Sequence, residues 1–544
     1  MKKSFIVLAI LGLIGFLTFI VLFKKALPQA GVDIEVLKQE SNKIASEYLA
    51  GIGVDAESFK KATILYGDAE AEIFLQRTWG VEKLNQELKK DEDLNLWSYE
   101  TRFFKPLEKE EYLVSTNLNG KVIGLSHSID DSVSGAKLTK DDAYKLVSEF
   151  ASSKLGINIG DYEQKDYSDK KLDSRTDHDF QFEIPNSQID WSQKSEGKGS
   201  KRISFSVMGD KVEGFGIFVY IPEEFQRLQD QTNSNGDLYE IIALFFALIL
   251  GILAIVTLSK KYKADDLKPR YFLIISVFLI TLTIIGFLNA GLDNIYFSYE
   301  TTVPWLNFLT TSVIGYVIAL GLLPLGILIM GLSGESLTRE IYPAANTFDS
   351  NASYEPKRIL KSTIEGIFIG LALLGYIAVF YYFGSKYLGI WSPVSPNLED
   401  YMSHFLPFLL PILVSIEAAI TEEFAFRYFA VPALKKYLRF TFLAILIPSI
   451  IWAFLHSTYA VYPMYIRGIE LTIVGVILAF VFIKKDIVTV ISAHYTFNAI
   501  LFSVPLFLSQ KYFLKVNSII PILAIFLIPL MYFLISRKRA ENKR

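Results

Sequence analysis

The stretch Glu417-Ala418-Ala419-Ile420-Thr421-Glu422-Glu423-Phe424-Ala425-Phe426-Arg427 places three carboxylates and one guanidinium inside a long apolar run. Charged side chains at bilayer depth cost about 3 kcal/mol or more each, so they are retained for a function or are paired. Glu423 and Arg427 are four residues apart, share a helix face and can form an ion pair. Glu422 points about 100° away from Glu423 on an α-helix, which leaves it for another task. The alternative interpretation is an ion network that only holds helices together.

About ten apolar runs recur along the chain, and a helix needs about twenty apolar residues to cross a bilayer. The runs lie at residues 5–23, 238–258, 271–291, 306–332, 363–384, 404–434, 441–461, 468–483, 487–508 and 518–536. The long segment between the first two runs is polar and mixed in pattern. We therefore predict an α-helical polytopic membrane bundle of about ten spans, with an extracytoplasmic α+β domain inserted between the first two spans.

Composition narrows the classes of function. The formal net charge is only -3, so nothing indicates a nucleic-acid partner. The absence of Cys excludes thiolate metal sites, disulfides and a Cys nucleophile. Only five His are present, so each His inside an apolar run is informative.

The chain divides into five predicted parts. They are a signal-anchor transmembrane helix at 1–27, the extracytoplasmic domain at 28–237, spans and cytoplasmic loops at 238–359, a core with the buried polar residues at 360–510, and a last span with a basic cytoplasmic tail at 511–544. The first run is longer than the apolar region of most cleaved signal peptides, which favours an uncleaved anchor.

The domain at 28–237 shows a tandem repeat of a helix followed by a hairpin. The helical patterns lie at 44–49 and 146–151, and the strand patterns lie at 111–115, 121–125, 202–207 and 211–215. This order resembles small PepSY-type domains. His127 and His178 lie in polar surroundings, so we expect both at the surface. No catalytic constellation is visible here, and we expect the domain to bind an extracytoplasmic ligand or partner.

Orientation follows from the Lys and Arg residues of the short loops, which concentrate in alternate loops. The basic set holds Lys260, Lys261, Lys263, Lys268, Arg270, Arg339, Lys357, Arg358, Lys361, Lys435, Lys436, Arg439, Lys484, Lys485 and the tail Arg537-Lys538-Arg539. This bias predicts that both termini are cytoplasmic. The Lys-, Ile- and Phe-rich composition hints at a bacterial source, so we expect a multi-pass protein of the bacterial plasma membrane.

Two further segments place polar residues at similar depth. One is Trp452-Ala453-Phe454-Leu455-His456, and the other is His494-Tyr495-Thr496-Phe497-Asn498. At 1.5 Å per residue, Glu422 and His456 lie about 20 and 25 Å from the basic ends of their runs. His494 lies about 12 Å from its own end, with Asn498 one turn deeper. Allowing for tilt, we expect the four residues to meet near mid-membrane.

Two schemes of peptide hydrolysis fit this set. A carboxylate in a low-dielectric pocket can act as a general base toward water, while imidazole and carboxamide groups stabilise the oxyanion. Alternatively, two His and a Glu can bind zinc and lower the pKa of its bound water. The soluble zinc-protease motif H-E-x-x-H is absent, and both schemes stay open.

The ordered motifs resemble those of the CPBP (Abi) family of intramembrane metalloproteases, related to the type II CAAX prenyl endopeptidases. The motifs are Glu422-Glu423-x-x-x-Arg427, an aromatic residue before x-x-x-His456, and His494-x-x-x-Asn498, within residues 360–510. The second motif usually begins with Phe, and here Trp452 keeps an aromatic wall. The resemblance implies that Glu422 activates water and that Glu423 and Arg427 position the site. It implies that His456, His494 and Asn498 serve the oxyanion pocket or the metal site, in which the ligands of Zn²⁺ would be Glu422, His456 and His494.

Four other polar residues receive structural interpretations. Glu417 is off the face of Glu422 and is expected to line the cavity or pack on another helix. His404 is expected to be a structural or exposed residue near the outer interface. Arg467 and Glu470 lie near a span end and are expected to snorkel toward water.

Three functions compete on these observations. The first is an intramembrane endopeptidase that cleaves a membrane-embedded or lipid-linked peptide or protein. The second is a non-proteolytic immunity or scaffold protein that keeps the fold. The third is a transporter with a proton or ion relay. Many transporters are built from inverted repeats, and the spans of this sequence show none. The first explains most of the polar residues.

Overall fold

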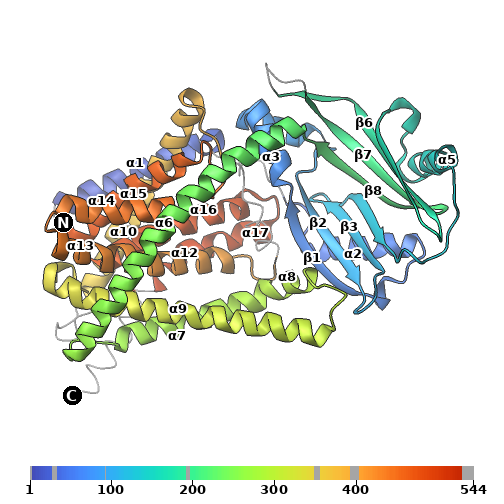
Figure 1. Cartoon of the computed structure of the whole chain (residues 1–544). Coiled ribbons are helices and arrows are strands. Elements are labelled where there is room, and N and C mark those ends of the chain that lie inside the picture. The colour runs from blue at the N-terminus through green and yellow to red at the C-terminus, as the bar shows by residue number, and fades with distance from the viewer. Residues whose placement is uncertain are drawn as a thin grey trace.

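The computed structural model describes residues 3–26, 34–91, 93–191, 197–347, 356–392, 404–527 and Pro529. It consists of a helical bundle and a sheet domain that lies against one end of the bundle (Figure 1). The helix α6 (Glu223–Lys263) joins the two parts, because it begins beside the sheet and runs the length of the bundle.

Most of the described chain beyond α6 is helical. The further bundle elements are α1 (Lys3–Ala26), α7 (Arg270–Gly286), the π-helical η5 (Phe287–Gly291), α8 (Leu292–Phe297), α9 (Trp305–Ile341), the short η6 (Pro343–Ala345), α10 (Pro356–Tyr387), α12 (Leu409–Glu422), the π-helical η7 (Glu423–Ala430), α13 (Val431–Leu438), α14 (Thr441–Phe454), α15 (Tyr465–Lys484), α16 (Ile487–Leu508), α17 (Tyr512–Asn517) and α18 (Ile519–Ala524).

Seven helices among the described residues are long and apolar enough to cross a membrane, compared with about ten expected spans. They belong to α1, α6, α7, α9, α10, α15 and α16. The difference has local causes. The helix α14 has only 14 residues, because the expected run at 441–461 leaves the helix after Phe454. The run at 404–434 is divided by η7, and the run at 518–536 extends beyond the described residues, as does the basic tail.

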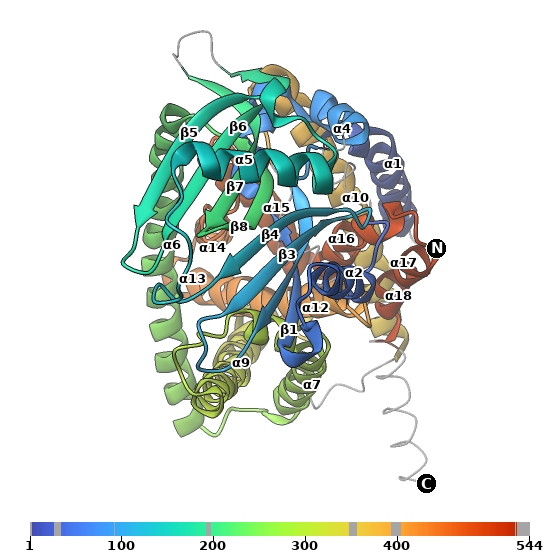
Figure 2. The same cartoon turned by 90° about the vertical axis from the view of Figure 1, so that its right-hand side faces the viewer.

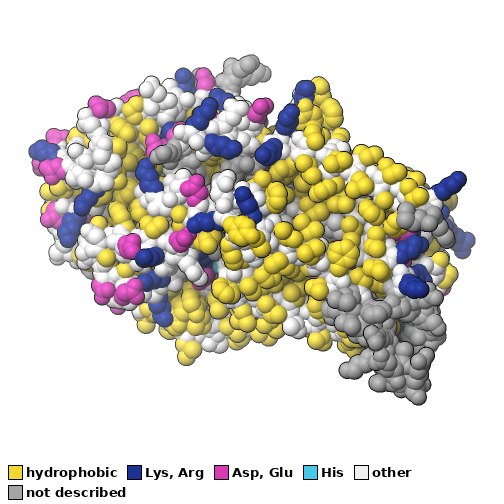
Figure 3. Space-filling view, turned by 180° about the vertical axis from the view of Figure 1, so that it is seen from behind, with side chains coloured by type: hydrophobic (Ala, Val, Ile, Leu, Met, Phe, Trp, Pro, Cys, Tyr) yellow, Lys and Arg dark blue, Asp and Glu magenta, His cyan; other side chains and the backbone are white. Residues whose placement is uncertain are grey.

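The bundle surface is that of a membrane protein. On the face shown in Figure 3, hydrophobic side chains cover the bundle, whereas charged side chains gather on the sheet domain and at the opposite end of the bundle. At that opposite end, ion pairs with acidic side chains connect three basic segments of the chain. Glu340 pairs with Lys261 and with Lys436, and Asp266 pairs with Arg339. Exposed apolar side chains over the bundle are stable only against lipid or a partner.

The helix α1 is packed as part of the bundle, along α10. A Cβ atom added at Gly375 would lie 2.5 Å from the Cα atom of Gly15, and one added at Gly12 would lie 2.7 Å from the carbonyl oxygen of Phe368. Small residues at these positions let the two helix backbones approach closely, which is how membrane helices associate without a hydrophobic driving force.

The sheet domain contains one antiparallel sheet of eight strands in the order β1-β2-β3-β4-β8-β7-β6-β5. The strands are β1 (Lys60–Gly67), β2 (Trp97–Phe104), β3 (Glu111–Asn117), β4 (Val122–Ser128), β5 (Glu163–Lys171), β6 (Thr176–Asp190), β7 (Lys198–Met208) and β8 (Lys211–Tyr220). The helices and short turns are α2 (Lys38–Gly51), η2 (Ala56–Ser58), α3 (Ala69–Trp79), α4 (Val81–Lys90), α5 (Lys140–Phe150), η3 (Ala151–Leu155) and η4 (Ile159–Asp161).

The strand order divides the sheet into two halves that join at β4 and β8. Each half is a helix, α2 or α5, followed by four antiparallel strands, rather than by the single hairpin expected from the sequence. The turns of β3–β4 and β7–β8 place Gly120 and Gly209 at φ +88 and +62, a conformation that glycine adopts without strain. The first half also contains α3 and α4 as an insertion between β1 and β2.

The two faces of the sheet have different neighbours. The helices α2 and α5 cover the face turned away from the bundle (Figure 2). Near the bundle, Phe74 of α3 and Phe225 of α6 share a buried apolar cluster with Tyr462 and Met464, which lie between α14 and α15. The sheet domain therefore packs directly on the segment that follows α14.

His127 and His178 are buried, which corrects the expectation that both lie at the surface. Their exposed fractions are 8% and 2%. The His127 ring bonds to Glu213, and the His178 ring bonds to Tyr167. Polar neighbours in sequence could not indicate this, because successive residues of a strand face opposite sides of a sheet.

Candidate active site

The predicted site residues come together inside the bundle from α12, η7, α16 and the turn after α14. A cavity of about 100 Å³ is lined by Glu422, His456, His494 and Asn498, together with Arg467 and mainly apolar or aromatic side chains. This volume is large enough to hold water. Glu423 and Arg427 lie behind this lining, with side chains 0% and 1% exposed.

Glu422 lies between the two imidazoles. Its Oε1 atom is 3.9 Å from Nε2 of His456, and its Oε2 atom is 3.9 Å from Nε2 of His494. Both distances exceed hydrogen-bond reach. The indole Nε1 of Trp452 donates a hydrogen bond to Glu422 Oε2 at 2.6 Å, which fixes one carboxylate oxygen. The Glu422 side chain keeps 25% exposure, so its carboxylate faces the cavity.

Backbone and carboxylate acceptors orient both imidazoles. His456 Nδ1 donates to the carbonyl oxygen of Trp452 at 2.8 Å. His494 Nδ1 donates to Glu423 Oε1 at 2.8 Å. With each Nδ1 engaged as a donor, Nε2 is the nitrogen that faces Glu422 and can accept a proton, a hydrogen bond or a metal ion.

The ion pair behind the site is buried and shared. Arg427 Nη1 donates to Glu423 Oε1 at 2.9 Å, the same oxygen that receives His494. The Arg427 guanidinium also lies 4.2 Å from the centre of the Trp452 ring. Glu423 and Arg427 thereby hold His494 and Trp452, two of the three side chains that contact or face Glu422.

The local helix geometry separates the two neighbouring carboxylates. Glu422 ends α12, and Glu423 begins the π-helical η7. Single π-helical turns inside longer helices are frequent at functional sites. Here the wider turn begins between the carboxylate that lines the cavity and the carboxylate that is buried behind it.

Sequence reasoning did not find three contributors to the cavity. Trp452 was expected only as an aromatic wall, although its indole N–H donates to Glu422. Tyr459 and Arg467 also line the cavity. The expectation that Arg467 and Glu470 snorkel is wrong: Glu470 is 0% exposed, and Arg467 Nη1 donates to it at 2.6 Å. Arg467 and Glu470 are three residues apart, and this spacing on a helix could have predicted the ion pair.

Glu417 and His404 lie outside this cavity. Glu417 is partly buried on α12 and is not part of the cavity lining. His404 is buried, with Nδ1 3.9 Å from Asp293 Oδ2, which agrees with a structural residue.

The donor set is chemically suited to zinc, but its spacing is wide. Two imidazole nitrogens and a carboxylate are common zinc ligands, and both rings have the oriented Nδ1–H that zinc sites use. Ligand atoms of a tetrahedral zinc site lie about 3.3 Å apart, whereas Glu422 is 3.9 Å from each Nε2. Within the described residues, no group of three His, Asp or Glu is close enough to hold a metal ion.

The fold and the site together define a multi-pass membrane protein with a polar cavity inside its helical bundle. Residues 404–500 match the family model described as type II CAAX prenyl endopeptidase Rce1-like. The matched segment contains all six predicted site residues. The resemblance seen in the sequence motifs is thereby confirmed at the level of the family.

The chain is also similar to one curated protein over nearly its whole length. It is 22% identical over 535 residues to the sporulation-killing factor biosynthesis protein SkfC of Bacillus subtilis (strain 168), covering 92% of this chain and 95% of that protein. No solved structure matches the chain. The similarity to SkfC includes the sheet domain, which lies outside the family match.

Proposed function

We propose that the protein is an intramembrane endopeptidase that hydrolyses peptide bonds of membrane-associated or lipid-linked substrates. The observation that carries this proposal is the position of Glu422, at 3.9 Å from an imidazole Nε2 on each side, in a cavity inside a family-matched bundle.

Glu422 is the general base in this proposal. It takes a proton from water as the water oxygen attacks the carbonyl carbon of the substrate peptide. The Asn498 amide N–H stabilises the resulting oxyanion, and an imidazole contributes a second donor when its Nε2 is protonated. Collapse of the intermediate then returns the proton to the leaving amine. Glu423 and Arg427 act through His494 and are positioning residues.

A zinc ion is compatible with the same residues. Glu422, His456 and His494 would hold it, with their side chains closer together than the 3.9 Å that separates Glu422 from each Nε2. The ion would lower the pKa of bound water and polarise the peptide carbonyl. The metal content of the protein therefore has to be measured separately from the effect of replacing Glu422.

We further propose the orientation in the membrane. The basic loops around Lys261, Arg339 and Lys436 meet at the end of the bundle away from the sheet domain. The excess of cations in cytoplasmic loops then places that end inside the cell and the sheet domain outside, in the plasma membrane of a bacterium. On this orientation, residues 455–464 of the site lie toward the outer side.

The test uses the full chain in lipid nanodiscs with a library of transmembrane and lipid-linked peptides, and mass spectrometry of the products. We expect cleavage by the wild type and a loss of at least a thousandfold in Glu422→Gln. The matched control is Glu417→Gln, which removes a carboxylate from the same helix outside the cavity and should keep the wild-type rate.

Two other results would redirect the proposal. Equal cleavage by wild type and Glu422→Gln would remove Glu422 as the base. A protein that binds the peptides but cleaves none, with intact Glu422, would favour the non-proteolytic scaffold. Elemental analysis of the purified protein, with cleavage measured before and after a chelator, decides the metal question whichever peptide is cleaved.

A further inference from the structure

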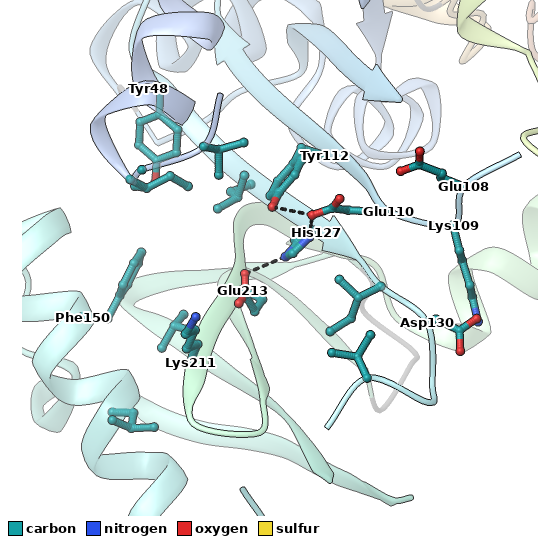
Figure 4. Close-up of a pocket in the computed structure, with 18 of the residues that line it drawn as sticks. Tyr48, Glu108, Lys109, Glu110, Tyr112, His127, Asp130, Phe150, Lys211 and Glu213 are labelled. Atoms are coloured by element: carbon teal, nitrogen blue, oxygen red, sulfur yellow. Dashed lines mark hydrogen bonds and ion pairs between the residues drawn. The ribbon is translucent and has the colours of Figure 1, made fainter. Parts of the chain in front are cut away.

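The sheet domain contains a second cavity, far from the residues of the proposed protease. It has a volume of about 1060 Å³, just above the range of about 300–1,000 Å³ that is usual for small-molecule sites. The cavity lies between the ends of α2 and α5, over the place where β4 meets β8 (Figure 4). Both halves of the sheet therefore contribute to one site.

The cavity opens on the face of the sheet turned away from the bundle, since α2 and α5 cover that face (Figure 2). A ligand dissolved in water can thus reach it without entering the membrane. Its walls are apolar on the helix side, where Tyr48, Leu146 and Phe150 line it. Side chains of this kind contribute most of the binding free energy in concave sites.

The charges around the cavity are mainly negative. Its lining includes five carboxylates and two ammonium groups, those of Glu108, Glu110, Asp130, Glu149, Glu213, Lys109 and Lys211. Lys109 lies 3.9 Å from Asp130 and 3.8 Å from Asp131. Lys105, which is not part of the lining, lies 3.9 Å from Glu108 and 3.8 Å from Glu110, so Glu149 and Glu213 are the lining carboxylates without a lysine in ion-pair range among the described residues. The cavity therefore favours a positively charged ligand.

A buried imidazole holds two of these carboxylates at the floor of the cavity (Figure 4). His127 is 8% exposed and stacks on Tyr112, with ring centres 3.9 Å apart. Its Nδ1 bonds to Glu213 at 2.7 Å, and this bond lowers the pKa of Glu213, which keeps that carboxylate charged.

The other imidazole nitrogen is not satisfied by the chain. His127 Nε2 is buried without a hydrogen bond among the described residues, and Oε1 of Glu110 lies 3.6 Å from it. A buried polar atom without a partner costs about 1–3 kcal/mol, so its retention indicates an interaction that the isolated chain does not make.

We propose that this cavity, defined by Tyr112, His127, Glu110, Glu213 and Phe150, binds a cationic amphipathic peptide from the aqueous phase. A basic side chain approaches Glu110 or Glu213 from the cavity, because His127 occupies the space between the two carboxylates. An apolar side chain packs on Phe150 and Tyr48. A backbone carbonyl or amide of the peptide reaches His127 Nε2. This inference goes beyond the proposed proteolysis and does not depend on it, since the cavity lies on the distal face of the sheet.

The test measures peptide binding to the full chain in nanodiscs of zwitterionic lipid, with empty nanodiscs as the blank. The probe is a fluorescent hexapeptide of alternating Lys and Phe, compared with analogues in which Gln or Glu replaces Lys. We expect the Lys peptide to bind at least tenfold more tightly than the Gln analogue, and the Glu analogue to bind weakest. Raising the salt concentration from 0.05 to 0.5 M should weaken the Lys peptide most.

Variants locate the site. Glu110→Gln combined with Glu213→Gln should weaken the Lys peptide at least tenfold and reduce its preference over the Gln analogue. Because that pair contacts His127 and can disturb the fold, Glu149→Gln on the cavity rim provides a second variant, with an expected weakening of about threefold. Glu47→Gln, on α2 and outside the cavity lining, is the matched control and should bind as the wild type does.

The proposal is overturned if the three peptides bind alike, which would show an apolar site without charge recognition. It is also overturned if Glu110→Gln with Glu213→Gln, still folded by circular dichroism, binds the Lys peptide as tightly as the wild type. Binding by Glu422→Gln equal to that of the wild type is expected, and it separates this site from the proposed protease.

Discussion

His494 donates a hydrogen bond from Nδ1 to Glu423 Oε1 at 2.8 Å, and this bond turns its Nε2 toward Glu422. The same carboxylate oxygen receives Arg427. Oε1 of Glu423 therefore accepts hydrogen bonds from both Arg427 and His494, so the ion pair with Arg427 also fixes the orientation of the His494 ring. The division of work between the two neighbouring glutamates follows from this bond: Glu422 faces the cavity, and Glu423 holds what surrounds it.

Glu423→Gln tests this division. The amide oxygen can still accept from His494, but Arg427 loses its countercharge, so the imidazole is held less firmly. Residues that orient a reacting group cost about 10–100-fold when changed. We expect kcat to fall by that factor with little change in KM, measured on any peptide that the wild type cleaves. A loss as complete as that of Glu422→Gln would instead assign the proton transfer to Glu423.

Trp452→Phe tests the hydrogen bond from the indole to Glu422. A hydrogen bond to a charged group contributes about 1.5 kcal/mol, which corresponds to a factor of about ten in rate. The phenyl ring keeps the wall over Arg427, so we expect normal folding and a kcat lowered about tenfold. Trp79→Phe in the sheet domain is the control, with no expected change. An unaltered rate in Trp452→Phe would show that Glu422 is positioned without this bond.

The sequence predicted which polar residues meet in the cavity better than it predicted their surroundings. Glu422, His456, His494 and Asn498 could be found because charged and amide groups are rare in apolar runs and share similar depths. The donor role of Trp452 could not be found in the same way, because it depends on side-chain orientation. Likewise, the start of a π-helix at Glu423 depends on packing around η7 and not on residue type alone.

The error at Arg467 and Glu470 has a tertiary cause. Both lie near the end of an apolar run, where a sequence pattern predicts contact with water. In the fold, residues 455–464 turn back over that end, and Tyr462 stacks on Trp391 with ring centres 4.2 Å apart. The first part of α6 then packs on the same segment, as Asn233 of α6 accepts a hydrogen bond from Tyr462 at 3.0 Å. The residues next to Arg467 and Glu470 in the sequence do not indicate that residues 455–464 bury this pair.

The buried pair of Arg467 and Glu470 provides a stability prediction. Removing one partner of a buried ion pair leaves an uncompensated charge and costs about 3–5 kcal/mol, whereas replacing both with apolar residues is often neutral. We expect Glu470→Leu to lower the midpoint of thermal unfolding strongly. The double variant Arg467→Met with Glu470→Leu should recover most of that loss. If the double variant is no more stable than the single one, the pair contributes through hydrogen bonds to Tyr381 and not through charge balance.

The network at the opposite end of the bundle predicts a dependence of stability on pH. Asp266 lies in the loop after α6, where partial burial by itself would raise its pKa. Hydrogen bonds from Arg339, Ser336 and Lys261 outweigh this and lower the pKa of Asp266 from 3.8 to about 2. A carboxyl whose pKa is lowered by folding stabilises the fold above its unfolded pKa, and that contribution is lost as the pH falls through the folded value.

Asp266→Asn should therefore destabilise the protein above pH 4, and the difference from the wild type should shrink between about pH 4 and pH 2. The Asp266 side chain is 30% exposed, so solvent screening reduces the expected effect to about 1 kcal/mol. The measurement is the midpoint of thermal unfolding in detergent at several pH values. Asp265→Asn is the matched control, since Asp265 is exposed in a left-handed conformation that Asn tolerates. A difference between wild type and Asp266→Asn that stays constant down to pH 2 would show that the network stabilises by shape rather than by the charge of Asp266.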